Sequence, residues 1–291
     1  MTRSSIAFIG LGAIGLPMAL SIVRAGFDVT GIEPAEAGRE RAADAGIRAV
    51  PTLAEVAPAD VVVVMVATAD QLDSVVDAAI EADAAAGATW IIMSTVGPDA
   101  VRAQGRRLAD AGASVVDAPV SGGIARASRG DLALFVSGSE GDLARVDDVL
   151  QAMGAPRVVG TEVGDGQSVK VVNQHLCAVH IAAAAEALAL AESLGLDPEF
   201  VLDVVGQGAA ASFMLGDRGP RMLQSPDAPV LSQIGIFVKD TGLVADAGAA
   251  ASAELPILTA ARERFLQADA SGLRTHDDSS VIETYRNRSA S

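Results

Sequence analysis

Several residue types are scarce in this chain, and each scarcity excludes a class of protein. A single cysteine, Cys177, among 291 residues rules out an internal disulfide and a cysteine-based metal cage. Aromatic residues make up only 3%, so the core must be built from Ala, Val, Leu and Ile. The longest uncharged apolar run near the middle, Val61–Ala67, is far too short to cross a bilayer, and no basic segment precedes the first expected strand. We expect a soluble, cytoplasmic protein without a membrane span or a bound metal.

Positive charge is scarce as well. The formal net charge of −16 argues against binding to the phosphates of DNA or RNA. Of the 21 basic side chains only two are lysines, Lys170 and Lys239. A crowded lysine can lower its pKa and exchange a proton with a substrate, whereas arginine stays protonated. Lys170 is therefore a candidate catalytic residue, and a general preference for arginine is the alternative explanation of these two positions.

A glycine-rich motif follows the first expected strand. Residues 5–9 form a short apolar strand, and Gly10, Gly12 and Gly15 lead into a helical pattern over 13–25. This is the GxGxxG pattern in the strand–turn–helix context of dinucleotide binding, where N–H groups at the helix start meet a pyrophosphate. The expected cofactor contacts are Gly10, Leu11, Gly12, Ala13, Ile14 and Gly15.

Glu33 follows the second expected strand, 28–32, near the spacing of about 20 residues typical of a ribose-binding carboxylate. Its charge would accept hydrogen bonds from the ribose hydroxyls and repel a 2′-phosphate, which favours NAD over NADP. Arg39, one turn into the next helix, is the residue that would favour NADP. A solvated acid at a strand end is the alternative interpretation of Glu33.

Strands and helices continue to alternate, with strands expected at 47–50, 60–66, 89–93 and 114–117 and helices from Asp70 and Pro98. This alternation predicts an α/β Rossmann fold, a doubly wound and mostly parallel sheet with helices on both faces. Ligands lie at the carboxyl ends of such strands, so the residues there are further cofactor candidates. They are Val66, Ala67 and Thr68 after one strand and Thr95 after the next. Either threonine can instead cap the helix that follows it.

A hydroxyl and two glycines, Ser121, Gly122 and Gly123, follow the strand at 114–117. Their consecutive backbone N–H groups form a concavity suited to a carboxylate, although glycine pairs also form ordinary turns. Farther on, Gly164-Asp165-Gly166 introduces a helix over 167–194 that spans roughly 40 Å at 1.5 Å per residue. We expect this helix to join a first domain, 1–163, to an all-helical second domain, 164–291.

Lys170, Asn173 and Gln174 share one face of this long helix. An amine and two amides on one face can hold a hydroxyl and transfer its proton. The alternative is a polar stripe facing solvent, against which the apolar flanking residues argue. Lys239, followed by Asp240, can approach the cofactor or simply pair with its neighbour, and the sequence leaves both open.

Taken together, these motifs resemble the β-hydroxyacid dehydrogenases, a family that includes 3-hydroxyisobutyrate dehydrogenases, tartronate semialdehyde reductases and L-threonate dehydrogenases. The resemblance thus places the chain among 3-hydroxyisobutyrate dehydrogenase-like and 6-phosphogluconate dehydrogenase-like proteins. The resemblance covers nearly the whole chain. It implies a Rossmann domain, a helical second domain around the long helix, and a homodimer or homotetramer built through the helical part. The motifs that carry it are residues 10–19, 117–123, 164–166 with 170–174, and Lys239-Asp240.

By the same resemblance, Lys170 is the general acid/base and Asn173 orients the reacting group. Ser121, Gly122 and Gly123 hold the substrate carboxylate, Gln174 lies in the substrate site, and Lys239 contacts the nicotinamide side of the cleft. Gln174 stands where many members carry Asn, which is similar to the sugar-acid branch. Thr241 replaces a common Leu.

The resemblance implies an NAD-dependent oxidoreductase that transfers a hydride between nicotinamide and a small hydroxy acid. A three- or four-carbon sugar acid such as threonate or glycerate is favoured, with 3-hydroxyisobutyrate as the alternative. Imine reductases share the architecture but usually carry Asp or Tyr where this chain has Lys170. A non-catalytic dinucleotide sensor that keeps the fold is the alternative from another class.

Overall fold

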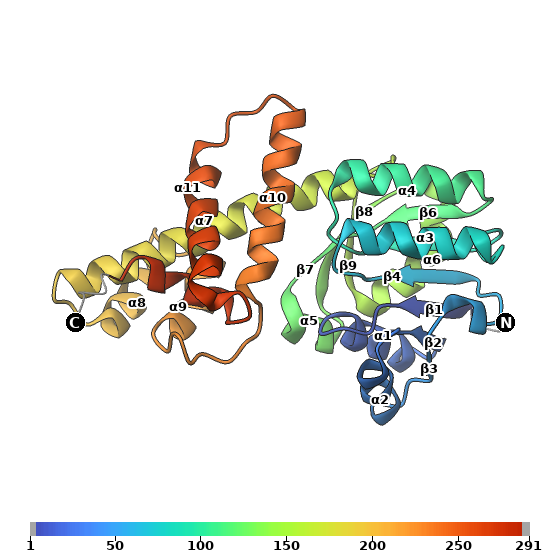
Figure 1. Cartoon of the computed structure of the whole chain (residues 1–291), viewed down its shortest axis with the longest axis horizontal. Coiled ribbons are helices and arrows are strands. Elements are labelled where there is room, and N and C mark those ends of the chain that lie inside the picture. The colour runs from blue at the N-terminus through green and yellow to red at the C-terminus, as the bar shows by residue number, and fades with distance from the viewer. Residues whose placement is uncertain (1–3, 287–291) are drawn as a thin grey trace. The chain divides into compact units, whose positions relative to one another are not determined.

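The computed structural model describes residues 4–286, and the chain divides into two compact units, 1–170 and 171–291 (Figure 1). The division falls inside the long helix, after Lys170, whereas the sequence pattern places the domain boundary before Gly164. The helix therefore begins in the first unit and continues in the second.

The first unit is built on one mostly parallel sheet, as predicted. In the described part of the chain its strand order is β3-β2-β1-β4-β5-β6-β8-β7, with β9 paired to β8. Strands β1 to β6 run parallel, and β8 is antiparallel to β6 and β7. The strands are β1 Ser5–Ile9, β2 Asp28–Ile32, β3 Ala49–Val50, β4 Val61–Val64, β5 Thr89–Ile92, β6 Ser114–Asp117, β7 Val120–Ser121, β8 Leu132–Ser137 and β9 Gly154–Gly160.

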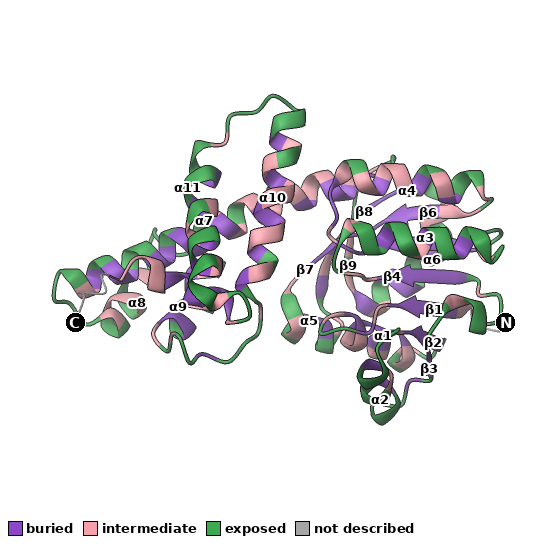
Figure 2. Ribbon diagram, viewed as in Figure 1, coloured by how far each residue is buried: buried purple, intermediate pink, exposed green. Residues whose placement is uncertain are grey.

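Helices cover both faces of this sheet because successive strand residues point to opposite sides. Phe8 and Val63 contribute to one core with α1 and α6, and Ile9 and Val64 to a second core with α3 and α4. Figure 2 shows the buried strands between helices whose outer faces are exposed. The helices of this unit are α1 Gly15–Arg24, α2 Glu36–Asp44, α3 Ala69–Glu81, α4 Pro98–Asp110, α5 Gly123–Arg129 and α6 Glu140–Met153, with the short helix η1 Leu53–Glu55.

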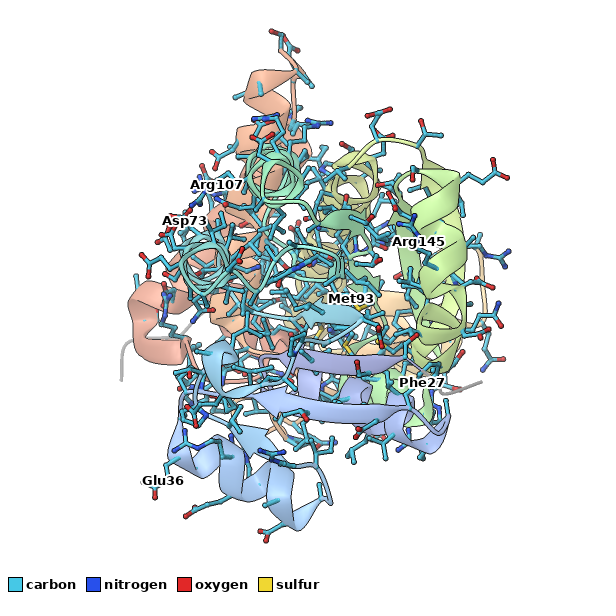
Figure 3. The ribbon with its side chains drawn as sticks, turned by 90° about the vertical axis from the view of Figure 1, so that its right-hand side faces the viewer. Phe27, Glu36, Asp73, Met93, Arg107 and Arg145 are labelled. Atoms are coloured by element: carbon cyan, nitrogen blue, oxygen red, sulfur yellow. The ribbon has the colours of Figure 1, made fainter. Side chains whose placement is uncertain are left out.

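At the surface, Arg107 of α4 donates to Asp73 of α3 at 2.6 Å, and Figure 3 shows the two side chains together, with Met93 farther inside the unit. Both partners are well exposed, so this ion pair adds little stability, about 0–1 kcal/mol. The packing of the apolar faces beneath it holds α3 and α4 on the sheet.

The sequence analysis assigned no elements between residues 122 and 163, yet this stretch contains α5, β8, α6 and β9. These elements extend the sheet beyond β6 with an antiparallel strand. The strand β8, Leu132–Ser137, alternates buried and half-buried residues along most of its length. The sequence does not reveal this alternation, because the half-buried Ala133 is as apolar as its buried neighbours.

The second unit is all-helical, as predicted. Its core includes Leu188 of α7 together with Phe237 and Phe265, whose rings stack with centroids 5.0 Å apart. Asp197 caps α8, accepting from the Glu199 N–H at 3.0 Å. The helices are α7 Asp165–Ser193, α8 Pro198–Gly206, α9 Phe213–Met222, α10 Ile234–Ala250 and α11 Pro256–Ala268, followed by the short helices η2 Asp269–Leu273 and η3 Asp278–Thr284.

Helix α7 has the length and apolar composition of a membrane-spanning helix, with a mean hydropathy of 1.4 over its most apolar window. Nearly half of that window, 44%, is buried within the protein. Core helices of globular proteins share these properties, so length and composition alone are weak evidence for a span.

The sequence also predicts a frayed end over 286–291. For Arg286 this is wrong, because its guanidinium donates to Glu192 at 3.0 Å and to Glu283 at 2.7 Å. Residues 287–291 lie outside the described part of the chain.

Candidate active site

The glycine motif lies between β1 and α1, and its three glycines serve different purposes. Gly10 has φ +94°, and a Cβ there would collide with the Met65 carbonyl. A Cβ on Gly15 would collide with the Gly10 carbonyl, so Gly15 is required where α1 approaches the end of β1, whereas Gly10 is required by its positive φ and by the neighbouring chain at Met65. Gly12 is exposed, and nothing lies within 4 Å of where its Cβ would be. This open space in front of a helix N-terminus fits a pyrophosphate.

Glu33 lies against this loop. Its Oε2 accepts from the Leu11 N–H at 3.1 Å and its Oε1 from the Ala35 N–H at 3.1 Å. Gly38 of α2 packs on the same side chain, since a Cβ there would lie 2.5 Å from Glu33 Cγ. The carboxylate is therefore fixed beside the glycine loop, where the ribose of a bound dinucleotide would lie.

Arg39 does not extend freely from α2. Its Nη1 donates to the Glu33 carbonyl at 3.0 Å and to the Pro34 carbonyl at 2.6 Å. The guanidinium thus stabilises the backbone at the end of β2. A 2′-phosphate would have to compete with these two hydrogen bonds for it.

The cofactor candidates after β4 and β5 differ in their local roles. The Val66 N–H donates to the Ser94 hydroxyl at 2.7 Å, while Ala67 and Thr68 are exposed. Thr68 forms a capping box with Gln71 at the start of α3, as the alternative interpretation held. Thr95 does not cap the helix after it, because the N-cap of α4 is Gly97. Thr95 is half-buried at the end of β5.

Ser121 ends the short strand β7 and is half-buried, as is Gly122. Both following glycines have positive φ, +141° at Gly122 and +69° at Gly123. Gly123 is exposed with open space around its missing Cβ. The loop therefore presents a hydroxyl and an open glycine backbone on the first unit.

Two residues that the sequence analysis did not select, Asp117 and Gln167, form a fully buried network at the start of α7. Asp117 Oδ2 accepts from the N–H groups of Gly164 at 3.1 Å and Gln167 at 2.9 Å. Burial raises the pKa of Asp117 to about 6, and the hydrogen bonds from Gln167, Gly164 and Ser137 oppose the rise. An acid directly after a buried strand, together with a Gln directly after Gly-Asp-Gly, was the sequence signal for this pair.

Lys170 lies on α7, one turn after Gln167, and is only 6% exposed. The preceding Gly166 allows the helix to approach the sheet, because a Cβ there would collide with the Phe135 carbonyl. A lysine of low exposure, one turn after a residue that bonds to Ser94 and Asp117 at the ends of β5 and β6, is suitably placed for proton transfer.

The remaining candidates gather in the second unit, on α7 and α10. Asn173 Nδ2 donates to Gln174 Oε1 at 2.8 Å, and Gln174 Nε2 donates to Asp240 Oδ2 at 2.5 Å. The Lys239 ammonium lies 2.9 Å from Asp240 Oδ1, which is the pairing that the sequence left open. Asp240, 4% exposed, thus joins residues from both helices, and its bond with Gln174 was not expected from the sequence.

The residues predicted for the site come from both units. The first contains the glycine motif, Glu33, the strand ends, the Ser121 loop and Lys170. The second contains Asn173, Gln174 and Lys239. Within residues 4–286, no group of three or more His, Cys, Asp or Glu side chains could hold a metal ion.

Comparison with known proteins decides the family. Residues 5–173 match the NAD binding domain of 6-phosphogluconate dehydrogenase, and residues 164–285 match the NAD-binding family of NADP-dependent 3-hydroxyisobutyrate dehydrogenase. The chain is 40% identical to an L-threonate dehydrogenase of Cupriavidus necator over 98% of its length and 97% of that protein. The chain belongs to the β-hydroxyacid dehydrogenase family. It is an NAD-binding oxidoreductase of hydroxyacids.

Further relatives agree. An L-threonate dehydrogenase of Haemophilus influenzae is 35% identical, with 97% of this chain and 95% of that protein covered. The crystal structure of a 3-hydroxyisobutyrate dehydrogenase from Salmonella typhimurium superposes with a TM-score of 0.89 at 32% identity, covering 97% of this chain and 100% of that one. The similarity therefore extends over both units, and the resemblance found in the motifs is confirmed.

Proposed function

We propose that this enzyme oxidises a three- or four-carbon sugar acid such as L-threonate with NAD, with Lys170 as the general base. The observation that carries the proposal is Lys170 itself, a lysine of 6% exposure one turn into a helix that is anchored to the sheet. The identity of 40% to an L-threonate dehydrogenase supports the substrate class. Gln174, in place of the Asn of many members, favours the same branch.

In this proposal each residue has one task. NAD supplies a hydride acceptor when bound. Lys170 Nζ accepts the hydroxyl proton, the Asn173 amide orients the hydroxyl, and Ser121 with the Gly122 and Gly123 N–H groups holds the carboxylate. The proton on Lys170 then passes to solvent. General-base catalysis of this kind is worth roughly a hundred- to ten-thousand-fold in rate.

The contacts of Glu33 and Arg39 support NAD rather than NADP. The Glu33 carboxylate lies beside the glycine loop, where it would repel a 2′-phosphate. The Arg39 guanidinium, which would attract that phosphate, is hydrogen-bonded to backbone carbonyls. The remaining cofactor contacts in the proposal are Val66, Ala67, Thr68 and Thr95 at the strand ends and Lys239 near the nicotinamide.

We also propose that the enzyme is cytoplasmic and forms a homodimer or homotetramer. Exposed apolar residues recur every three to seven positions along one face of α7 in the second unit. Such a stripe on a helix is typical of a surface covered by a partner, here a second copy of the chain packed on the helical domain, 164–291. The stripe is Val172, Leu176, Ala183, Ala187 and Leu190, and the exposed Leu194 follows directly after the helix. Light scattering that gives a monomer mass at micromolar concentration would contradict this part of the proposal.

The decisive experiment is to follow NADH absorbance with L-threonate, glycerate and 3-hydroxyisobutyrate, each also with NADP. We expect the highest kcat/KM with L-threonate or glycerate and NAD, and loss of turnover in Lys170→Ala with NAD binding retained. A preference for 3-hydroxyisobutyrate would support the alternative suggested by the Salmonella typhimurium structure. NAD binding without turnover on any acid would favour the non-catalytic sensor.

A further inference from the structure

A continuous series of buried hydrogen bonds runs along the carboxyl ends of β4, β5 and β6 in the first unit. The Val66 N–H donates to the Ser94 hydroxyl at 2.7 Å. The Ser94 carbonyl accepts from Gln167 Nε2 at 2.9 Å, and the same nitrogen donates to Asp117 Oδ1 at 3.0 Å. Ser94, Asp117 and Gln167 are all 0% exposed, so water does not compete for the bonds that join these three residues.

Gln167 has no spare hydrogen-bonding capacity. Its Oε1 accepts from the N–H groups of Val96 at 3.2 Å and Gly97 at 3.1 Å, while its Nε2 makes the two donations to Ser94 and Asp117. Reversing the amide would place donor against donor and acceptor against acceptor at every contact. The side chain is therefore held in one orientation.

Asp117 fixes the backbone of the same helical turn. Its Oδ2 accepts from the N–H groups of Gly164 and Gln167, which have no partner within the helix. A carboxylate at a helix N-terminus also interacts favourably with the helix dipole. The first turn of α7 is thus held by its backbone through Asp117 and by a side chain through Gln167.

Lys170 is the next residue on this side of α7, three positions after Gln167. We propose that Gln167, held by Asp117, is a positioning residue that fixes Lys170 relative to the strand ends carrying the expected cofactor contacts Val66 and Thr95. The inference rests on the proposed function, because it assumes that Lys170 is the general base. Gln167 acts through Lys170 and touches no reacting atom in this account.

The test is an exchange of the two partners. Gln167→Glu places an oxygen against Asp117 Oδ1, and Asp117→Asn places an N–H group against Gln167 Nε2. In the double variant the new amide at position 117 donates to the new carboxylate at position 167, which restores the bond in the opposite direction with no change in net charge. Only the contact with the Ser94 carbonyl stays unfavourable, so the rescue is partial.

We expect each single substitution to lower kcat by about ten- to a hundredfold, the effect of misplacing a catalytic group by about 1 Å, with KM for the hydroxy acid unchanged. The double variant should recover about tenfold of that loss. A purely structural role would lower stability without this split between kcat and KM. The matched control is Gln151→Glu on the exposed face of α6, which should keep wild-type kcat.

Thermal unfolding followed by circular dichroism establishes that each variant is folded at the assay temperature. If Gln167→Glu does not fold, Gln167→Met takes its place, since it keeps the length without adding charge. Wild-type kcat in the folded single variants, or a double variant no faster than the slower single one, overturns the inference while the proposed function stands. A wild-type protein that oxidises no hydroxy acid overturns both.

Discussion

The Gln174 amide donates a 2.5 Å hydrogen bond to the Asp240 carboxylate, which links α7 to α10 through two buried side chains. The other oxygen of Asp240 lies 2.9 Å from the Lys239 ammonium. A residue assigned to the substrate site from sequence therefore also holds two helices together. Gln174 Oε1 accepts from Asn173 and Nε2 donates to Asp240, so these bonds fix which end of the amide faces Asn173.

Replacing Gln174 by Leu should lower the free energy of unfolding by about 1–3 kcal/mol, because it removes a donor from a buried carboxylate. Urea denaturation measures the change. Gln207→Leu is a matched control, since Gln207 is the exposed C-cap residue of α8 and its side-chain amide donates to Asp203, one turn earlier. An equal effect of the two substitutions would argue against the buried link.

Lys170→Arg should reduce kcat by about a hundred- to ten-thousand-fold, as expected for loss of a general base. Arginine preserves the positive charge but does not release its proton at any working pH. NAD affinity, measured by fluorescence titration, should stay at the wild-type value. A variant that keeps more than half of wild-type turnover would show that charge alone is needed at this position.

Glu33→Ser should shift the ratio of kcat/KM for NADP over NAD upward by about ten- to a hundredfold. The substitution removes charged hydrogen bonds to the ribose, each worth about 1.5–3 kcal/mol, and the repulsion of a 2′-phosphate. Initial rates with both cofactors give the ratio. Glu36→Ser, an exposed acid in the first turn of α2, serves as the control and should leave the ratio unchanged.

Asp117 should make the protein less stable as the pH rises from about 4 to about 6. Its pKa is about 6 in the folded state and near 3.8 when unfolded, so in this window the folded state binds more protons and stability falls with rising pH. The contribution is about 3 kcal/mol at 1.36 kcal/mol per pKa unit. Denaturation of wild type and Asp117→Asn across this range isolates it. Parallel stability curves for the two proteins would contradict the raised pKa.

The sequence predicts the parts of the fold that depend on local pattern. The strand–glycine–helix start, the Val-rich strand β4 and the long helix α7 all follow from apolar periodicity and from glycines at fixed positions. The two-residue strand β7 and the antiparallel β8 were not found, because their pairing is set by contacts distant in the chain. The local propensity of a segment does not determine which distant strand it pairs with.

In the candidate site, too, some residues can be predicted from local sequence and others only from the folded structure. Lys170 and Glu33 stand out by residue type and spacing, so the sequence alone selected them. Asp117, Gln167 and Asp240 stand out only when burial and partners are known, since an acid or an amide in a sequence is ordinarily a solvated surface residue. The residues that support the site were therefore harder to predict than those that would perform the chemistry.

The glycines of the GxGxxG motif are under two kinds of selection, one for folding and one for binding the dinucleotide, and the open space at Gly12 shows which applies there. A side chain at Gly10 collides with the Met65 carbonyl and one at Gly15 collides with the Gly10 carbonyl, so selection for a folded chain removes both substitutions whether or not a cofactor is used. A side chain at Gly12 meets no protein atom, so only selection for binding the dinucleotide removes it. In a lineage that gave up the cofactor, Gly12 would drift first while Gly10 and Gly15 persisted. A glycine kept at this middle position of the motif therefore indicates that the protein still binds the dinucleotide.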